Sequence, residues 1–211
     1  MTDADKIVLF HSPNTRSSAA LTLLEELGAP FELRVLNMQA GEQRQPAYLA
    51  INPMGKVPAI LHGDVLVTEQ VAIFLYLGDL FPRAGLTPAV GDKRRGPYLR
   101  WMTFYAGCFE PAVVDRAMKR EPGTPAMSPY GDFDTVMAAV NAQLRAGPFI
   151  LGDEFSVADV LWGAALMWTC GFGLVPETPG IKAYVEHATN RPAALRVRDR
   201  DAELSAQHKA S

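Results

Sequence analysis

The sequence lacks the features that mark several large classes of protein. Only two cysteines, Cys108 and Cys170, occur among 211 residues, and both lie in segments with a helical pattern. A disulfide framework is therefore excluded, and a reduced protein is expected. No apolar run approaches the roughly 20 residues of a membrane span, and the N-terminus has no apolar stretch typical of a signal peptide. We expect a cytoplasmic protein with no membrane partner.

An excess of one charge is also missing. Lys and Arg number 20 against 23 Asp and Glu, and the basic residues are scattered along the chain, so no nucleic-acid partner is expected. The histidines and cysteines show no metal-ligand spacing, so no metal is expected. Nucleophile-elbow, phosphate-loop and dinucleotide motifs do not occur.

Hydrophobic residues make up 48% of the chain, enough for a sizeable core. Up to residue 80, segments with strand and helix patterns alternate. Strands are predicted at 7–10, 31–36, 59–61 and 65–67, and helices at 17–27, 45–49 and 69–80. The strand-helix-strand start implies a parallel pair with a right-handed crossover, and the tight turn at 62–64 implies a hairpin. This order predicts a mixed four-stranded sheet.

The second part of the chain has a helical pattern. A Pro- and Gly-rich stretch ends the first part and is typical of a linker. Beyond it, helices are predicted at 98–119, 132–145, 156–169, 181–190 and 192–202, with a frayed polar tail from Ser205. The predicted fold class is therefore α/β plus all-α, with a first domain at 1–81, a linker at 82–92 and an all-helical domain at 93–211.

The segment 52–58 carries an unusual proline before a strand-like run. Because proline cannot donate a ladder hydrogen bond, Pro58 is tolerated only at the first residue, an edge or a bulge of a strand. Such a position leaves the backbone of Val57 available to pair with a molecule outside the protein. Glu69 and Gln70 then open an apolar helix, whose unpaired amides and positive dipole end attract an anionic group. Together these segments indicate a cradle for a small, extended, acid-bearing peptide.

Polar residues follow the first predicted strand. Loops at the carboxyl ends of strands are where open α/β sheets bind ligands. Ser12 and Asn14 are short polar residues in such a loop and could hydrogen-bond an anion. The alternative is that Ser12, Asn14 or Thr15 only caps the following helix. The residues alone leave both interpretations open.

Two patterns belong to the helical region. Ser156 and Asp159 form a capping box, which predicts a structural role for Asp159 and not that of a catalytic acid. The helix at 98–119 carries a row of residues at helical spacing that could form a pocket wall or part of the core. These residues are Trp101, Phe104, Tyr105 and Cys108.

The order of these features resembles the cytosolic glutathione transferases over nearly the whole chain. The resemblance implies a thioredoxin-like N-terminal domain and a C-terminal helical bundle domain, usually in a homodimer. It implies that Pro58 is cis and that Val57 pairs its backbone with the cysteinyl part of glutathione. It also implies that Glu69 and Gln70 hold the γ-glutamyl end, and that the capping box is a folding element of the helical domain.

Some residues depart from the family's usual pattern. The pair at 69–70 is Glu-Gln, where the family usually has Glu-Ser. The first loop has neither the tyrosine of the mammalian-type classes nor the cysteine of the bacterial beta and omega types. Ser12-Pro13-Asn14 instead resembles the Ser-type classes or the Thr-Pro-Asn loop of nu-type enzymes. The class is therefore open between nu-like and theta-like.

The resemblance implies a detoxifying transferase that binds glutathione as co-substrate. The hydroxyl of Ser12 would donate to the thiolate, with Asn14 assisting or acting as the main donor, and Arg16 adding a positive field. Lys56 is either a partner of the glycine carboxylate or a solvated loop lysine. The thiolate would attack a small hydrophobic electrophile near the aromatic helix. Glutathione-dependent disulfide or peroxide reduction, or ligand binding with little turnover, are the alternative functions.

Overall fold

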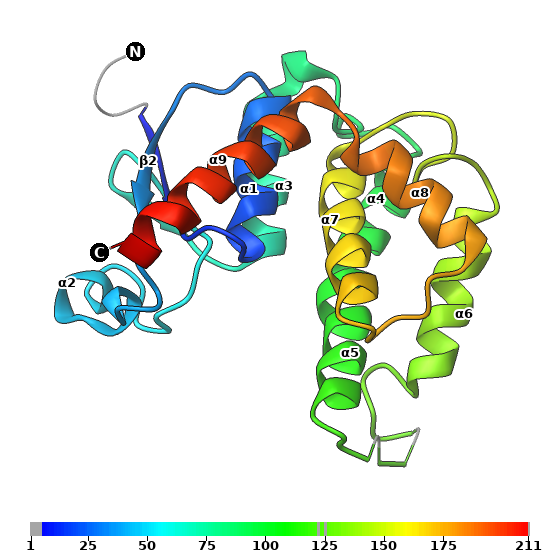
Figure 1. Cartoon of the computed structure of the whole chain (residues 1–211). Helices are drawn as coiled ribbons and strands as arrows, with labels where there is room; N and C mark the ends of the chain where they lie inside the picture. The colour runs from blue at the N-terminus through cyan, green and yellow to red at the C-terminus, as the bar shows by residue number, and fades with distance from the viewer. Residues whose placement is uncertain (1–5, 122, 125, 211) are drawn as a thin grey trace. The chain divides into compact units, whose positions relative to one another are not determined.

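The computed structural model describes residues 6–121, 123–124 and 126–210 (Figure 1). The chain divides into two compact units. The first contains the described residues up to Ala84 and those from Arg191 onward, and the second spans Gly85–Asn190. In chain order, the first unit contains β1 (Ile7–His11), α1 (Arg16–Glu26), β2 (Phe31–Val35), η2 (Glu42–Arg44), α2 (Pro46–Leu49), β3 (Ala59–His62), β4 (Val65–Val67), α3 (Gln70–Leu80), η3 (Pro82–Ala84) and α9 (Pro192–Ala210).

A four-stranded sheet in the order β2-β1-β3-β4 forms the centre of the first unit. β1 and β2 are parallel, with Ile7 opposite Phe31, whereas β3 is antiparallel to both β1 and β4. The mixture of parallel and antiparallel pairs follows from the connections between strands. The crossover through α1 preserves the strand direction, and the β3–β4 hairpin reverses it. The predicted thioredoxin-like arrangement is confirmed.

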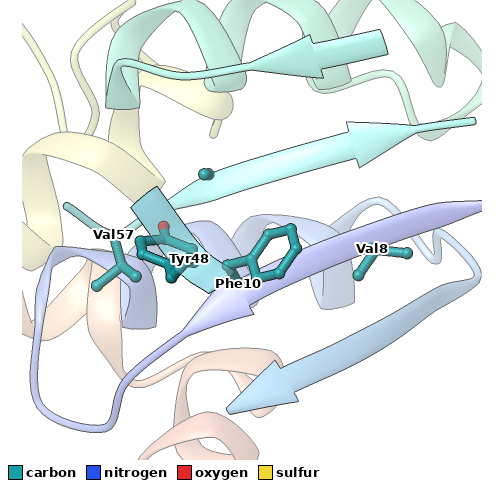
Figure 2. Packing of buried hydrophobic residues seen from close by; sticks show 5 residues of the cluster. Val8, Phe10, Tyr48 and Val57 are labelled. Atoms are coloured by element: carbon teal, nitrogen blue, oxygen red, sulfur yellow. The ribbon is translucent and has the colours of Figure 1, made fainter. Parts of the chain in front are cut away.

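β1 is buried along its whole length. Because side chains alternate along a strand, Ile7 and Leu9 point to one face of the sheet, where α1 and α3 pack. The other face carries a second hydrophobic cluster, in which Val57 packs close to the strand that leads into Ser12. Its buried members are Val8, Phe10, Tyr48, Val57 and Ala59 (Figure 2). Burial of each large apolar side chain stabilises the unit by about 1.5–3 kcal/mol.

Helix α9 differs from the prediction in length and in place. We expected a helix ending near residue 202, a frayed tail from Ser205, and a helical domain that extended to the end of the chain. Instead α9 continues to Ala210 and lies along α1 in the first unit (Figure 1). Two ion pairs join these parts of the chain, Arg191–Glu26 and Arg196–Glu25. The predicted extent 93–211 is therefore corrected at its C-terminal end, because packing on α1 orders a polar segment that looks frayed in isolation.

The second unit is helical. Its elements are α4 (Arg95–Phe104), the π-helical turn η4 (Tyr105–Phe109), α5 (Glu110–Ala117), α6 (Phe133–Leu144), α7 (Val157–Gly171) and α8 (Pro179–Thr189). The rings of Trp101, Tyr105 and Phe109 lie around Trp162 of α7, with centroids 5.0 to 5.6 Å from its ring. The Trp162 indole also donates to the Trp101 carbonyl at 3.1 Å. In the described part of the chain, no helix has the length and apolar character needed to cross a membrane.

The Ser156–Asp159 capping box is present at the start of α7. The Asp159 carboxylate accepts from the amide and hydroxyl of Ser156 at 2.8 and 2.9 Å. It also accepts from the Ile150 amide at 2.7 Å and the Tyr184 hydroxyl at 3.0 Å. Burial raises the pKa of the Asp159 carboxyl, although these hydrogen bonds oppose the shift. The side chain thus ties α7 to α8 and to the segment before it.

Candidate functional site

The loop between β1 and α1 is fixed by short hydrogen bonds. The Ser12 amide donates to Ser17 Oγ at 3.0 Å, and the Ser12 carbonyl accepts from Thr15 Oγ1 at 2.7 Å. Thr15 is the N-cap of α1, and its Oγ1 accepts from the Ser17 amide at 3.2 Å. The side chains of Ser12 and Asn14 are therefore not needed as the cap and remain available for other contacts.

Ser12 lies in the wall of a cavity of about 420 Å³ within the first unit. The residue is only 4% exposed. Its hydroxyl has no hydrogen bond to any other residue in the described ranges. The cavity is lined by the first loop, the segment after β2 and the end of α9, through Ser12, Pro13, Asn14, Thr15, Met38, Gln39, Ser205, His208 and Lys209.

Asn14 has an unusual backbone conformation and two contacts with α9. Its φ of 55° lies in the left-handed region, which asparagine adopts more readily than most residues. The Asn14 amide donates to Asp201 Oδ2 at 2.9 Å, and its side-chain Nδ2 donates to Ser205 Oγ at 2.7 Å. One hydrogen of the side-chain amide is thus already used within the protein.

His11, the last residue of β1, forms a buried pair with Asp201 of α9. His11 Nε2 lies 3.0 Å from Asp201 Oδ1, and His11 Nδ1 lies 2.9 Å from Ser17 Oγ. Asp201 Oδ2 also accepts from the Ser18 hydroxyl. Burial raises the pKa of the Asp201 carboxyl, but its hydrogen bonds, that from His11 foremost, outweigh burial and leave the pKa below its usual value. No group of three or more acidic, His or Cys side chains in the described ranges is arranged to hold a metal.

The loop before β3 presents the backbone of Val57. The Val57–Pro58 peptide bond is cis, as the resemblance implied. The preceding carbonyl, that of Lys56, accepts from the Tyr48 hydroxyl at 2.6 Å and from Asn52 Nδ2 at 2.9 Å. The Lys56 side chain is exposed. The amide and carbonyl of Val57 have no hydrogen-bond partner among the described residues, so both can pair with a ligand.

The start of α3 carries the predicted acid-polar pair. Glu69 is the N-cap of α3, but its side chain makes no capping hydrogen bond. Its φ of 64° is a conformation that costs on the order of 1–3 kcal/mol in a residue other than glycine and that clusters at functional sites. The neighbouring Gln70 Nε2 donates to the Arg16 carbonyl at 3.3 Å. The predicted residues Arg16 and Gln70 thus meet at the starts of α1 and α3.

The sheet register brings the first loop and the Val57 loop to the same edge. β1 and β3 are antiparallel, with Phe10 opposite Ala59. The carboxyl end of β1 therefore lies beside the amino end of β3. Ser12 follows Phe10 closely in the chain, and Val57 closely precedes Ala59, so both loops leave the sheet together.

The four residues predicted as a pocket wall do not share one environment. Trp101 and Tyr105 are 2% and 4% exposed and belong to the aromatic cluster around Trp162. Phe104 and Cys108 are half-buried. The π-helical turn η4 lies within this row and changes the spacing that the prediction assumed. Only Phe104 and Cys108 therefore expose enough surface to remain candidates for contact with an electrophile.

Several residues of the site were missed at the level of sequence. Asn52 opens the segment 52–58 and Tyr48 closely precedes it, and their polar groups beside Pro58 are a signal that could have found their role. Asp201 and Ser205 lie in a charged helix with no local motif. Their contacts depend on the position of α9 on α1, which only the tertiary structure shows.

A thioredoxin-like sheet with a cis-proline loop, followed by a helical unit, defines the class of the cytosolic glutathione transferases. Residues 6–79 match the family described as "Glutathione S-transferase, N-terminal domain". The chain is 30% identical over 156 residues to glutathione S-transferase F10 of Arabidopsis thaliana, covering 68% of this chain and 72% of that protein. It is 28% identical over 187 residues to glutathione S-transferase GstA of Escherichia coli O157:H7, covering 87% and 93%.

Solved structures agree with the sequence comparison. A sphingomonad glutathione S-transferase complexed with glutathione has a TM-score of 0.73 and 28% identity, with 92% of this chain and 98% of that chain covered. A glutathione transferase from Methylococcus capsulatus str. bath has a TM-score of 0.78 at 28% identity, with 93% and 99% covered. The chain therefore belongs to the glutathione S-transferase family.

Proposed function

We propose that this protein is a glutathione transferase in which Ser12 stabilises the thiolate of glutathione for attack on a hydrophobic electrophile. One observation carries the proposal. The backbone of Ser12 is held on both sides by Ser17 and Thr15, the residue lies in the wall of a cavity, and its hydroxyl has no partner among the described residues. A fixed donor without an internal partner is the arrangement that stabilises charge on a ligand without reorganisation.

The same edge of the sheet supplies contacts for the rest of the tripeptide. In the proposal, the cysteinyl backbone pairs with the amide and carbonyl of Val57, which precedes β3 and lies outside the ladder. The γ-glutamyl end binds at Glu69 and Gln70, where the first amides of α3 also favour a carboxylate.

Two cationic residues complete the proposed binding of glutathione. Arg16 adds positive charge at the start of α1, and Lys56 is the partner of the glycine carboxylate. Both side chains are exposed, so each contributes a modest, salt-sensitive share of the affinity.

The energy required is within reach of one or two hydrogen bonds. A free thiol has a pKa of about 8.5, so only a few per cent is ionised at neutral pH. Lowering that pKa by about two units needs roughly 2.7 kcal/mol, and a hydrogen bond to a charged group contributes about 1.5–3 kcal/mol. Ser12 is the main donor in this proposal. Asn14 assists through the amide hydrogen that Ser205 leaves unused.

The remaining elements of the proposal concern the electrophile, the assembly and the location. Phe104 and Cys108 of the helical unit contact a small hydrophobic electrophile. The protein is proposed to be cytoplasmic and to form a homodimer, and sedimentation of the purified chain tests the dimer.

The test is calorimetry of glutathione binding from about pH 6 to about pH 9, spanning the thiol pKa, on the wild type, Ser12→Ala and Ser12→Thr. We expect proton release on binding near neutral pH in the wild type. The release should shift to higher pH in Ser12→Ala and stay near the wild-type pH in Ser12→Thr, which keeps a hydroxyl. Proton release unchanged in Ser12→Ala would refute the role of Ser12.

Turnover of two substrates separates the alternative functions. A chromogenic aryl electrophile should be conjugated at a rate that falls in Ser12→Ala. Turnover of a mixed disulfide without turnover of the electrophile would instead indicate a reductase. Binding with neither activity would indicate a ligand-binding protein.

A further inference from the structure

Helix α9 makes a concentrated set of hydrogen bonds to the first loop. Asp201 is 4% exposed, and its carboxylate contacts His11, Asn14 and Ser18. These partners lie on both sides of Ser12, from the end of β1 to the first turn of α1. One side chain near the C-terminus thus holds the whole segment that carries the proposed thiolate donor.

The loop's own hydrogen bonds hold Ser12 and Thr15, whereas the Asn14 amide is held by Asp201. Asn14 adopts a left-handed φ of 55°, which asparagine tolerates better than most residues but which lies outside the main allowed regions. Its amide donates to Asp201 at 2.9 Å. On the other side, His11 links Asp201 to Ser17 Oγ, the atom that accepts from the Ser12 amide at 3.0 Å. Asp201 therefore reaches the backbone of Ser12 by a continuous chain of hydrogen bonds.

We propose that Asp201 is a positioning residue for thiol activation, and that α9 is a functional part of the glutathione site. The inference rests on the proposed function. In it, the carboxylate of Asp201 fixes the loop so that the Ser12 hydroxyl is aimed at the sulfur of glutathione. The carboxylate itself does not touch the substrate.

The sign of the effect distinguishes positioning from a direct electrostatic effect. A negative charge near the sulfur disfavours the thiolate, so removal of the Asp201 charge would by itself lower the pKa of the bound thiol. Loss of the Ser12 hydrogen bond through a displaced loop would raise that pKa. The two mechanisms therefore predict shifts in opposite directions.

The experiment titrates the ultraviolet absorbance of enzyme-bound glutathione thiolate in the wild type, Asp201→Asn and Asp199→Asn. Asp199 is an exposed carboxylate of the same helix, so its variant is matched in charge and size. We expect the pKa of the bound thiol to rise by about one unit in Asp201→Asn, equal to about tenfold less thiolate at a pH below both midpoints. Asp199→Asn should titrate like the wild type.

A double mutant tests whether Asp201 acts through Ser12. In the Ser12→Ala background, Asp201→Asn should cause little further shift, because the donor that it positions is already gone. Turnover by Asp201→Asn should also approach the wild-type rate at high pH, where the thiolate forms without help. A general structural defect would instead lower the rate by the same factor at every pH.

Several outcomes would overturn the inference. An unchanged or lowered thiol pKa in Asp201→Asn would do so while leaving the proposed function intact, as would full additivity in the double mutant. A wild type that binds glutathione without forming thiolate would overturn the proposed function, and this inference with it. If Asp201→Asn does not fold, Ser18→Ala can be used instead, because it removes one partner of Asp201. The pKa of the bound thiol should then rise by a smaller amount, and an unchanged pKa would overturn the inference.

Discussion

Replacement of Asp159 by asparagine should destabilise the helical unit strongly, although the two side chains have nearly the same size. The two carboxylate oxygens accept hydrogen bonds from Ser156, Ile150 and Tyr184. Oδ2 accepts twice from Ser156, and Oδ1 accepts from the other two residues. An asparagine has one acceptor oxygen, so in either orientation its NH2 group faces a backbone N–H, which loses its acceptor, and a hydroxyl, which loses the charged acceptor and can only turn to accept from the NH2 group.

The size of the effect follows from these contacts. A hydrogen bond to a charged group contributes about 1.5–3 kcal/mol, so the loss of two costs roughly 3–6 kcal/mol. The total stability of a domain is only about 5–15 kcal/mol. The burial that raises the pKa of Asp159 offsets part of the loss, because the neutral amide needs no buried charge. We therefore expect a value near the lower end, about 3 kcal/mol.

Tryptophan fluorescence during urea unfolding measures this change in the relevant unit. All three tryptophans, Trp101, Trp162 and Trp168, lie in the helical unit, so the signal reports its unfolding. With an m-value of about 1–3 kcal/mol/M, a loss of about 3 kcal/mol lowers the midpoint by roughly 1–3 M. Asp153→Asn is the control, because Asp153 is exposed in the same unit and should change stability by less than about 0.5 kcal/mol.

A midpoint for Asp159→Asn that matches that of Asp153→Asn would refute the reasoning. It would mean that the buried donors find other acceptors or water at little cost. Tyr184→Phe gives a second check, since it removes one donor to the carboxylate without removing any acceptor. Its cost should be smaller than that of Asp159→Asn.

Two further predictions concern the first unit. Gly55→Ala should lower the stability of this unit by at least about 1 kcal/mol and weaken glutathione binding, because Gly55 has a φ of 58° and a Cβ would lie 2.8 Å from the Gln43 carbonyl. Thermal unfolding measures the stability, and calorimetry measures the binding. The control is Gly28→Ala, which has a similar φ but open space around the added Cβ and should affect stability alone. Since the pKa of Asp201 is lowered in the folded protein, its stabilising contribution is present above the usual pKa of about 3.9 and is lost as the pH falls through the folded value. Circular dichroism should show a smaller loss of stability on acidification in Asp201→Asn than in Asp199→Asn, and equal losses would contradict this.

Local patterns in the sequence were enough to predict the loop that holds Val57. Proline restricts its own backbone and removes a donor, so the strand had to begin at or after Pro58, and it begins at Ala59. The capping box at Ser156 is equally local, because its atoms lie within one turn of helix. Such features can be predicted from the sequence because the interacting groups are neighbours in the chain.

The aromatic helix shows where local pattern was insufficient. Helical spacing placed Trp101 and Tyr105 on one face, but spacing does not reveal whether that face meets a ligand or another helix. Trp162, far away in the chain, fills the space against both rings. The assignment to core was thus a matter of tertiary packing.

The sequence by itself determined the mixed sheet, the helical second part, the free backbone at Val57 and the position of Ser12 at the end of a strand. Each depends on hydrophobic periodicity or on the restricted geometry of a few adjacent residues. Only the tertiary structure decided that α9 belongs to the first unit and that Asp201 contacts the Ser12 loop. Those contacts join residues separated by 183 to 190 positions, and their geometry is set by how two helices pack, which no local pattern encodes.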